Sequence, residues 1–220
     1  MVTVAAVQVT NYCGRGAEYV RKLFDGCRRY LPDARYVCLT DDPSTVPEYA
    51  EARLVPAGMK GWWNKMYLFS PDAFTPGERV LFFDLDTLIT GDISEIAGYS
   101  GSFAIARDPF HEAYVSSAVM AWEAGTADHI WHIWDGAGRP ETLREGDQKW
   151  IEFLVPGIVL LNDVFPRQIV SFKKHCFRQG LLPAGARICM LHGQPRPHDA
   201  ALVIPWINRI WNQPTDQGDY

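Results

Sequence analysis

Two carboxylates lie two residues apart directly after an apolar segment, in the stretch ERVLFFDLDTLITGDI at residues 78–93. Residues 80–83 form a continuous apolar run that is typical of a buried central strand. Asp84 and Asp86 follow this run, and in an extended chain their side chains point to one side, about 7 Å apart. Two carboxylates so placed suit joint binding of one divalent cation, with coordination positions left for a diphosphate.

A D-x-D triplet is by itself a weak signal, because most such carboxylates in soluble proteins belong to solvated loops. The position of this pair favours the metal interpretation, since the ligands of open α/β sheets bind outside the carboxyl ends of the strands. Other elements of the chain would have to place further polar groups at the same edge.

Composition limits the class of protein. The chain has 220 residues, which is a natural length for one domain. Its content of 47% hydrophobic and 13% aromatic residues argues against disorder. A net charge of −5 gives no overall support for a nucleic-acid backbone as partner. The five cysteines show no regular spacing, which predicts reduced thiols in a cytoplasmic protein.

The N-terminal stretch VTVAAVQV lacks a basic leader and a long apolar core, so it is expected to form a first strand and not a signal peptide. No apolar run approaches the roughly 20 residues of a membrane span. We expect no stable membrane span, and the oligomeric state cannot be predicted from these features.

Apolar periodicity predicts one α/β domain at residues 1–211 and a loosely held polar tail at residues 212–220. Strands are predicted at residues 2–9, 35–40, 51–55, 80–83, 102–106 and 115–122, with shorter strand-like pieces at 158–161, 168–172 and 188–192. Helices are predicted at residues 17–30, 62–69, 92–97 (capped by Asp92), 127–134 and 149–154.

Four separated motifs occur in one order along this pattern. They are Thr10-Asn11-Tyr12 after the first strand, Asn64-Lys65 in a helix, FFDLDTLITGDI, and GDQKW followed by MLHGQPRP. Together they resemble the GT-A-fold glycosyltransferases, most closely the retaining family that includes glycogenin and the bacterial lipopolysaccharide galactosyl- and glucosyltransferases.

In that family the metal motif resembles D-x-D-T-x-x-x-x-D-I, and His-Gly-x-x-(Lys/Arg)-Pro comes near the C-terminus; here these motifs fall at residues 84–93 and 192–197. The resemblance covers roughly residues 1–200. It implies a single Rossmann-like nucleotide-diphospho-sugar transferase domain of the GT-A type, with a mixed, mostly parallel central sheet flanked by helices.

The resemblance implies that Asp84, Asp86 and His192 bind the metal. Two carboxylates and one imidazole favour Mn²⁺, with Mg²⁺ as the alternative. Without the resemblance, His192 would be interpreted as a turn histidine before Gly193.

Donor-binding residues are also implied by the resemblance. Leu85 lies within the metal motif, Gly193 allows close approach of the backbone to the diphosphate, and Arg196 offsets charge on the leaving group. Lys65 is expected to reach the donor phosphates or sugar; the alternative is an ordinary surface lysine. Thr10, Asn11 and Tyr12 are expected to hold the nucleobase, Tyr12 by stacking.

Asp147 and Gln148 resemble the Asp-Gln pair of the family, which implies that Asp147 contacts the donor sugar and Gln148 lies near the anomeric carbon; an N-cap aspartate is the alternative. Arg107 and Asp108 are weaker candidates for donor-sugar contacts. Residues 116–118, Ser-Ser-Ala, replace an Asn-(Ala/Ser)-Gly motif. Of the adjacent Trp62 and Trp63, one is expected to pack in the core and the other to line the acceptor side.

The function predicted is a metal-dependent glycosyltransferase, with Lys65, Asp147, Gln148 and Arg196 as catalytic candidates. It would move a hexosyl group from a nucleotide sugar, most simply a UDP-sugar, to an acceptor hydroxyl with retention. The acceptor stays open between a saccharide, a glycolipid, a protein and a modified nucleobase. The alternatives are a metal-dependent nucleotidyltransferase or phosphohydrolase, and a non-catalytic sugar-nucleotide-binding module.

Overall fold

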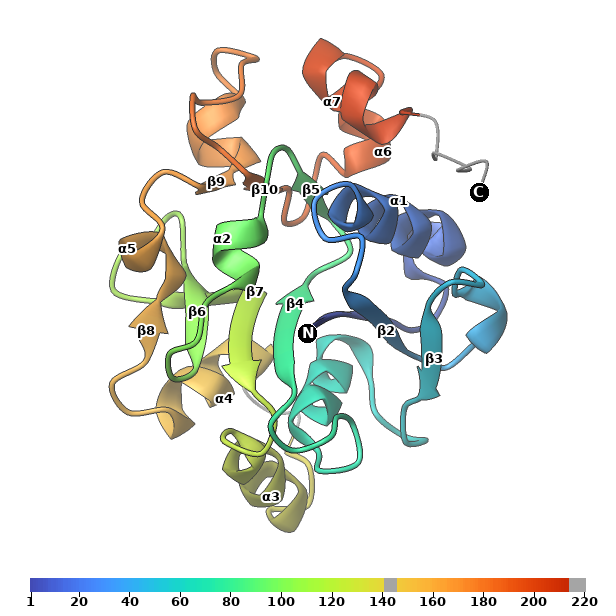
Figure 1. Ribbon diagram of the computed structural model, residues 1–220, viewed down its shortest axis with the longest axis vertical. Helices are drawn as coiled ribbons and strands as arrows, with labels where there is room; N and C mark the ends of the chain where they lie inside the picture. The colour runs from blue at the N-terminus through green and yellow to red at the C-terminus, as the bar shows by residue number, and fades with distance from the viewer. Residues whose placement is uncertain (141–145, 214–220) are drawn as a thin grey trace.

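The computed structural model describes residues 1–140 and 146–213, and a seven-stranded sheet forms its centre (Figure 1). The strand order is β3-β2-β1-β4-β7-β6-β8. These strands are β1 (Val2–Gln8), β2 (Arg35–Thr40), β3 (Glu51–Leu54), β4 (Arg79–Phe83), β6 (Ala104–Arg107), β7 (Val115–Glu123) and β8 (Val159–Leu160). The strands β1 to β4 run parallel, and β7 is antiparallel to both of its neighbours. The predicted mixed, mostly parallel sheet is confirmed.

The central strand β4 is buried on both faces, as its apolar run predicts. Leu81 and Phe83 join the hydrophobic cluster on one face of the sheet, whereas Val80 and Phe82 join the cluster on the other. None of the four is more than 1% exposed. Because each face is covered, the strand carries apolar residues at every position and not at alternate ones.

Helices cover both faces of the sheet. The helix α1 (Gly16–Arg28) packs on the face of Leu81, through the buried side chains Tyr19, Val20, Leu23, Phe24 and Cys27 that its periodicity predicts. The opposite face is covered by the 3₁₀ helix η3 (Gly61–Phe69), α3 (Asp128–Gly136) and α4 (Gly146–Leu154). The sheet is therefore the middle layer of three.

A second sheet of three short strands connects the C-terminal part of the chain to the D-x-D segment. Its order is β5-β10-β9, with β5 at Thr87–Ile89, β10 at Ile188–Met190 and β9 at Ile169–Ser171. The amide of Leu191 donates to the carbonyl of Asp86 at 3.0 Å. This sheet lies with α6 (Pro197–Ala200) and α7 (Pro205–Trp211) at the end of the molecule opposite α3 (Figure 1). It brings the His192 segment beside the carboxylate pair.

Some element boundaries differ from the predictions. The helix α2 (Ser94–Ala97) begins two residues after Asp92, whose carboxylate accepts from the Ser94 amide at 2.9 Å. Residues 158–161 change from β8 to the helix α5 (Leu161–Val164), and β9 is followed by the π-helical turn η4 (Phe172–Cys176). The remaining elements are the short 3₁₀ turns η1 (Tyr12–Gly14) and η2 (Pro43–Thr45). The predicted tail lies outside the described residues from 214 onward.

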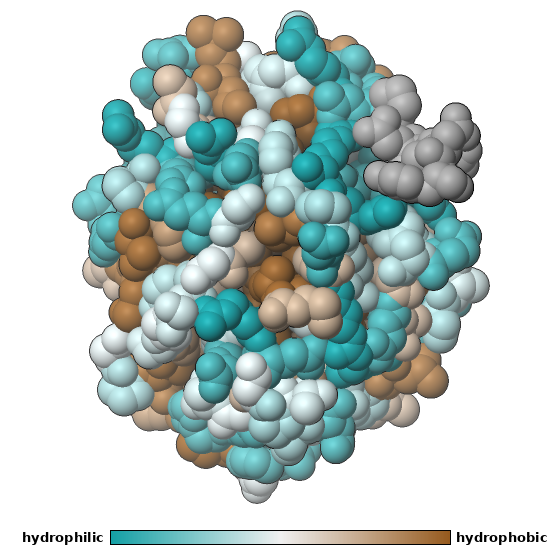
Figure 2. Space-filling view, viewed as in Figure 1, coloured by the Kyte–Doolittle hydropathy of each residue, from teal (hydrophilic) through white to brown (hydrophobic). Residues whose placement is uncertain are grey.

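The surface shown in Figure 2 is mixed in hydropathy, and most of the cysteines are buried. On the face shown in Figure 2, hydrophobic residues occupy separate areas among hydrophilic ones. None of the five cysteines forms a disulfide, and four of them are buried. No described helix combines the length and apolar character needed to cross a lipid bilayer.

Candidate active site

A cavity of about 520 Å³ opens where β1 and β4 end. Its walls come from the segments after these two strands, from η3, from the start of β7 and of α4, and from the segment after β10. The lining residues are Val7, Val9, Thr10, Tyr12, Gly61, Trp62, Lys65, Asp84, Leu85, Asp86, Ser116, Ser117, Ala118, Asp147, Gln148, His192, Gly193 and Arg196. Eleven of the twelve main candidates from sequence for catalysis, donor binding or metal binding line this cavity; Asn11 does not, and neither do the weaker candidates Arg107 and Asp108.

Lys65 forms the centre of a charged cluster on one side of the cavity. Its ammonium donates to Asp84 Oδ2 at 2.9 Å and to the Ser117 hydroxyl at 3.1 Å, and lies 3.6 Å from Asp147 Oδ2. Burial acts to lower the pKa of Lys65, but Asp147 and Asp84 outweigh it and hold the pKa above its ordinary value. Lys65 is therefore a fixed cation and not the surface lysine of the alternative interpretation.

Opposing effects act on the pKa of Asp84. Burial raises the pKa of its carboxyl to about 6; Lys65 lowers the pKa, whereas Asp86 raises it. Three carboxylates, of Asp84, Asp86 and Asp147, thus line the cavity with two fixed cations, Lys65 and Arg196. This excess of negative charge favours the arrival of a further cation.

Asp86 has a separate set of partners. Its Oδ2 accepts from Arg196 Nη1 at 2.5 Å and from the Tyr12 hydroxyl at 3.0 Å, and Arg196 also donates to that hydroxyl. The Arg196 guanidinium lies 5.0 Å from the centre of the Tyr12 ring. Burial, followed by Asp86, raises the pKa of Tyr12, so its hydroxyl stays protonated and donates. Asp86 is 6% exposed, and Arg196 compensates its charge.

His192 lies on the wall next to β9. Its Nε2 is 2.8 Å from the Ser171 hydroxyl, and its ring meets Phe110 edge-on at 5.7 Å. Burial, assisted by Lys173, lowers the pKa of His192, which favours the neutral imidazole that binds metals. Among the described residues, no group of three His, Cys, Asp or Glu side chains stands together as a ready metal site.

The segment after β1 has two distinct roles. Thr10 and Tyr12 line the cavity, and the Thr10 amide donates to Asp41 Oδ2 at 2.8 Å. Asn11 adopts a left-handed conformation with φ 47°, and its Oδ1 accepts from the Gly16 amide at 2.9 Å. Its side chain thus satisfies a backbone donor at the start of α1 and does not reach the cavity. The nucleobase contact expected of Asn11 therefore stays a prediction, although Asn11 is not among the residues that line the cavity.

Asp147 and Gln148 reach the cavity from the first turn of α4. Asp147 is 5% exposed, and its Oδ2 accepts no hydrogen bond from a described residue. Gly146, just before it, has φ +67°, and a Cβ there would lie 2.5 Å from Trp62 Nε1. Trp62 is 56% exposed and lines the cavity, whereas Trp63 is buried and stacks on Trp134, as predicted for one of the pair; that the other lines the acceptor side stays a prediction.

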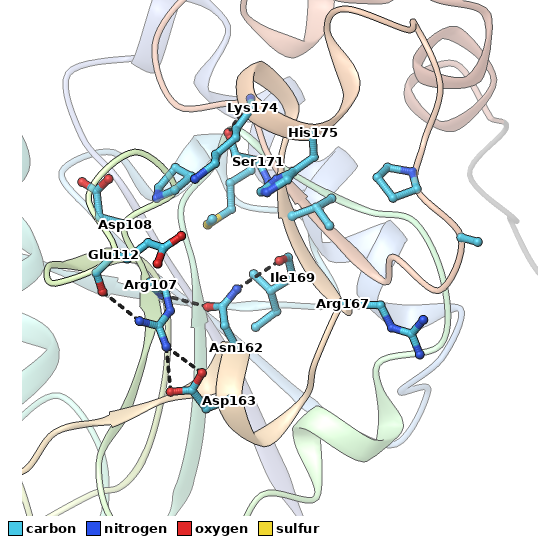
Figure 3. A pocket seen from close by; sticks show the side chains of 15 residues that line it. Arg107, Asp108, Glu112, Asn162, Asp163, Arg167, Ile169, Ser171, Lys174 and His175 are labelled. Carbon is cyan, nitrogen blue, oxygen red and sulfur yellow. Dashed lines mark hydrogen bonds and ion pairs between the residues drawn. The ribbon is translucent and has the colours of Figure 1, made fainter.

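Arg107 and Asp108 do not line this cavity. Arg107 donates to both carboxylate oxygens of Asp163, at 2.6 and 2.7 Å, and to the Glu112 carbonyl, in a neighbouring pocket (Figure 3). The weaker prediction of donor-sugar contacts by this pair gains no support from the conformation described. The cavity is also lined by Val7, Val9 and Gly61, which the sequence motifs did not indicate. Of these three, only Gly61 could have been noticed in the sequence, because it directly precedes the tryptophan pair.

Comparison of the sequence with protein-family models gives no match, and neither does comparison with curated proteins. Solved structures do match. The galactosyltransferase LgtC, in complex with donor and acceptor sugar analogues, has a TM-score of 0.69 at 11% identity, covering 99% of this chain and 98% of that one.

Two further solved structures are similar. GlyE from Streptococcus pneumoniae TIGR4 has a TM-score of 0.69 at 14% identity, covering 97% of this chain and 61% of that one. A glycosyltransferase involved in glycosylation of the major capsid of PBCV-1 has a TM-score of 0.60 at 13% identity, covering 95% and 98%. The chain has the GT-A fold. At these identities the likeness establishes the fold and leaves the chemistry to the site.

The donor set of this GT-A domain suits a divalent cation. The side chains of Asp84, Asp86 and His192 line one cavity, and they supply two carboxylates and an imidazole that is neutral at ordinary pH. In the conformation described, Lys65 and Arg196 contact the two carboxylates and Ser171 contacts the histidine. A bound metal ion would replace the Arg196 and Ser171 contacts, so the residues fit the ion after local side-chain movement.

Proposed function

We propose that the protein is a metal-dependent glycosyltransferase that moves a hexosyl group from a UDP-sugar to an acceptor hydroxyl with retention of configuration. The observation that carries the proposal is the meeting of Asp84, Asp86, Lys65 and Arg196 in one cavity at the carboxyl end of β4 in a GT-A fold. Acidic groups suit a metal ion, and basic groups beside them suit the diphosphate that this ion accompanies.

Asp84, Asp86 and His192 would hold the metal, Mn²⁺ or Mg²⁺. The bound ion would neutralise charge on the diphosphate and make it a better leaving group. Arg196, which pairs with Asp86 Oδ2 in the conformation described, would supply a positive charge to the diphosphate. Gly193, with φ +80°, gives this segment a backbone that a phosphate can approach closely.

The nucleoside would lie between the end of β1 and the Tyr12 ring. Val7 and Val9 supply an apolar surface there, and Thr10 offers polar atoms at the rim. One edge of Tyr12 packs on Tyr19 at 5.2 Å, which fixes the ring in place. A fixed aromatic ring loses little conformational entropy when a base stacks on it.

The groups expected around the sugar position are compatible with retention. Asp147 would accept hydrogen bonds from donor-sugar hydroxyls through its Oδ2, which is ion-paired with Lys65 but accepts no hydrogen bond from a described residue. Gln148 is the group expected near the anomeric carbon, and an amide is a poor nucleophile. A front-face substitution, in which a departing phosphate oxygen accepts the proton of the acceptor hydroxyl, therefore fits this site better than a covalent intermediate.

Calorimetric titration of the protein with UDP, with and without Mn²⁺, tests the donor site. We expect binding that requires Mn²⁺, disappears with EDTA and is lost in Asp86→Ala while the fold is retained. Asp92→Ala is the matched control, because that carboxylate is exposed and caps α2 away from the cavity. Release of UDP from UDP-glucose or UDP-galactose then tests turnover.

Each other outcome points to an alternative. Metal-dependent binding of UDP without turnover of any UDP-sugar, in the presence of acceptors, would favour a non-catalytic sugar-nucleotide-binding module. Failure to bind any nucleotide, together with metal-dependent release of phosphate from phosphate esters, would favour a phosphohydrolase. Metal-dependent binding of another nucleotide would keep the class of enzyme and change the donor.

A further inference from the structure

Tyr19 of α1 is a fully buried tyrosine that lies behind the donor cavity and does not line it. Its hydroxyl lies 2.5 Å from His198 Nδ1 in α6, 179 residues further along the chain. A hydroxyl can donate or accept, so this hydrogen bond forms with either neutral tautomer of the histidine. The function proposed above assigns no role to either side chain.

The Tyr19 ring supports the ring of Tyr12, which lines the cavity. The two rings meet edge-on, with their centres 5.2 Å apart. Tyr19 also meets Trp211 of α7 at 5.0 Å, and the Trp211 indole donates to Glu18 Oε1 at 3.2 Å. Because α1 and α7 hold the Tyr19 ring together in the core, it gives Tyr12 a fixed surface to pack on.

His198, the partner of Tyr19, belongs to the segment that carries Arg196. Arg196 directly precedes α6 and is extended, with φ −75° and ψ 159°. Pro197 begins α6 and is buried, and the Ala200 amide donates to the Arg196 carbonyl at 2.9 Å. Since proline also fixes its own φ, the backbone from Arg196 to His198 is rigid. A contact that holds His198 therefore holds the backbone of Arg196 as well.

Four side chains thus form a closed circuit behind the cavity. Tyr12 packs on Tyr19, and Tyr19 is hydrogen-bonded to His198. Arg196, two residues before His198, donates to the Tyr12 hydroxyl and lies 5.0 Å from the centre of its ring. The circuit joins the segment after β1, where the nucleoside is proposed to bind, to the segment before α6, which carries a cation for the diphosphate.

The Arg196 guanidinium depends on this circuit because its own hydrogen bonds are incomplete. Its Nη1 donates to Asp86 and Tyr12, whereas its Nε is buried and has no hydrogen-bond partner among the described residues. A long side chain loses conformational entropy when it is held for a phosphate, and a fixed backbone beneath it reduces that cost. The position of α6 should therefore influence how well Arg196 meets the diphosphate.

We propose that Tyr19 and His198 are positioning residues of the donor site, whose hydrogen bond holds the Arg196 segment beside Tyr12. The cation for the diphosphate and the surface for the base are thereby kept at a fixed separation. Neither residue touches the donor. This proposal rests on the glycosyltransferase function proposed above, and it adds two residues that determine affinity for the diphosphate part of the donor.

Calorimetric titration of the full chain with UDP or with uridine, in the presence of Mn²⁺, tests the proposal. We expect Tyr19→Phe, which removes only the hydroxyl, to weaken UDP binding about fivefold and to leave uridine binding nearly unchanged. His198→Ala should have the same effect. His198→Asn should restore most of the UDP affinity, because its amide places a hydrogen-bonding atom near the position of Nδ1.

Tyr36→Phe is the matched control for the loss of a buried tyrosine hydroxyl. Tyr36 is 4% exposed and belongs to the same hydrophobic cluster as Tyr19, and its hydroxyl donates to the Leu31 carbonyl at 2.8 Å, away from the cavity. Both tyrosine variants should lower the urea midpoint similarly, but only Tyr19→Phe should weaken UDP binding. In an Arg196→Met background Tyr19→Phe should cause no further loss, since it acts through that guanidinium.

The outcomes separate the positioning role from the proposed function. If the parent binds UDP with Mn²⁺ and both Tyr19→Phe and His198→Ala bind it equally well, the positioning role is wrong and the donor site stands. A loss of UDP affinity that Tyr36→Phe shares, that extends to uridine, or that persists in the Arg196→Met background would also overturn the positioning role. If the parent binds no UDP, the proposed donor site fails, and the positioning role fails with it.

Discussion

The Lys65 ammonium lies 2.8 Å from Asp84 Oδ1 and 3.6 Å from Asp147 Oδ2, so one cation joins the end of β4 to the first turn of α4. These groups come from chain segments 19 and 82 residues away from Lys65 in sequence. Lys65 is 13% exposed at its side chain, and Asp84 27%. Because little solvent reaches these side chains, the negative charge of the two carboxylates is compensated by Lys65.

Lys65→Met should lower the free energy of unfolding by about 2–3 kcal/mol near neutral pH, because it leaves two carboxylates without their cation. The loss should shrink at about pH 5, where protonated Asp84 no longer needs a counter-charge. Urea denaturation of both proteins at the two pH values measures the effect. Lys60→Met, at an exposed lysine near the start of η3, should behave like the parent. An equal loss at both pH values would show that Lys65 acts by packing alone.

Binding of Mn²⁺ should weaken as the pH falls through about 6, because a proton and the metal compete for Asp84, whose pKa burial raises to about 6. The raised pKa also means that Asp84 favours folding below its unfolded value of 3.8 and loses this contribution as the pH rises through about 6. Calorimetry in buffers of different ionisation enthalpy should detect about half a proton released per ion at about pH 6, and close to one at about pH 5. Metal binding with no release of protons would contradict this assignment.

Arg196→Met should weaken UDP binding about tenfold, since the diphosphate loses a charged hydrogen-bond donor. Uridine affinity should hardly change, because uridine has no phosphate. Affinity for Mn²⁺ alone should not fall, because Arg196 competes with the ion for Asp86 Oδ2. Calorimetry with the three ligands separates these effects, and Arg209→Met, on the exposed side of α7, is the control. A parallel loss of uridine and UDP binding would mean that the substitution disturbs the Tyr12 ring instead.

Local sequence predicted what depends on near neighbours. The apolar run before Asp84 indicated a buried strand whose end carries the acidic pair, and the periodicity of residues 17–30 indicated α1. The resemblance to a known family then identified most of the residues that line the donor cavity. The strand and the helix could be predicted because a buried strand or helix face must be apolar wherever it lies in the chain.

Features that depend on distant partners could not be predicted. The contacts of Arg196 with Asp86 and of His192 with Ser171 span 110 and 21 residues, and no local pattern encodes them. Arg107 contacts Asp163, which lies in α5 just beyond the strand-like piece predicted at residues 158–161. The strand-like pieces predicted at residues 168–172 and 188–192 contain β9 and β10, but nothing local indicated β5 or the pairing of the three strands that brings His192 to the cavity.

Gly146→Ala tests whether the Trp62 indole shapes the donor cavity. A Cβ at Gly146 would lie 2.5 Å from Trp62 Nε1, and Trp62 is half exposed, so the indole should move aside and the fold should survive. Gly157→Ala is a closely matched control, because Gly157 has φ +69° against +67° for Gly146 but has no atom within 4 Å of its Cβ position. Both variants should lose about 1 kcal/mol of unfolding free energy to the left-handed conformation.

UDP-sugar turnover should separate the two variants. Only Gly146→Ala should lower turnover, by about tenfold. The substitution would displace either the Trp62 indole or the start of α4, which carries Asp147, and so misplace the donor. In a Trp62→Ala background the same glycine substitution should have little further effect on turnover, since the clashing ring is gone. If Gly146→Ala still lowers turnover in that background, the glycine acts on the backbone before Asp147 and not through Trp62. Equal turnover in Gly146→Ala and Gly157→Ala would mean that the indole adapts without consequence for the donor site.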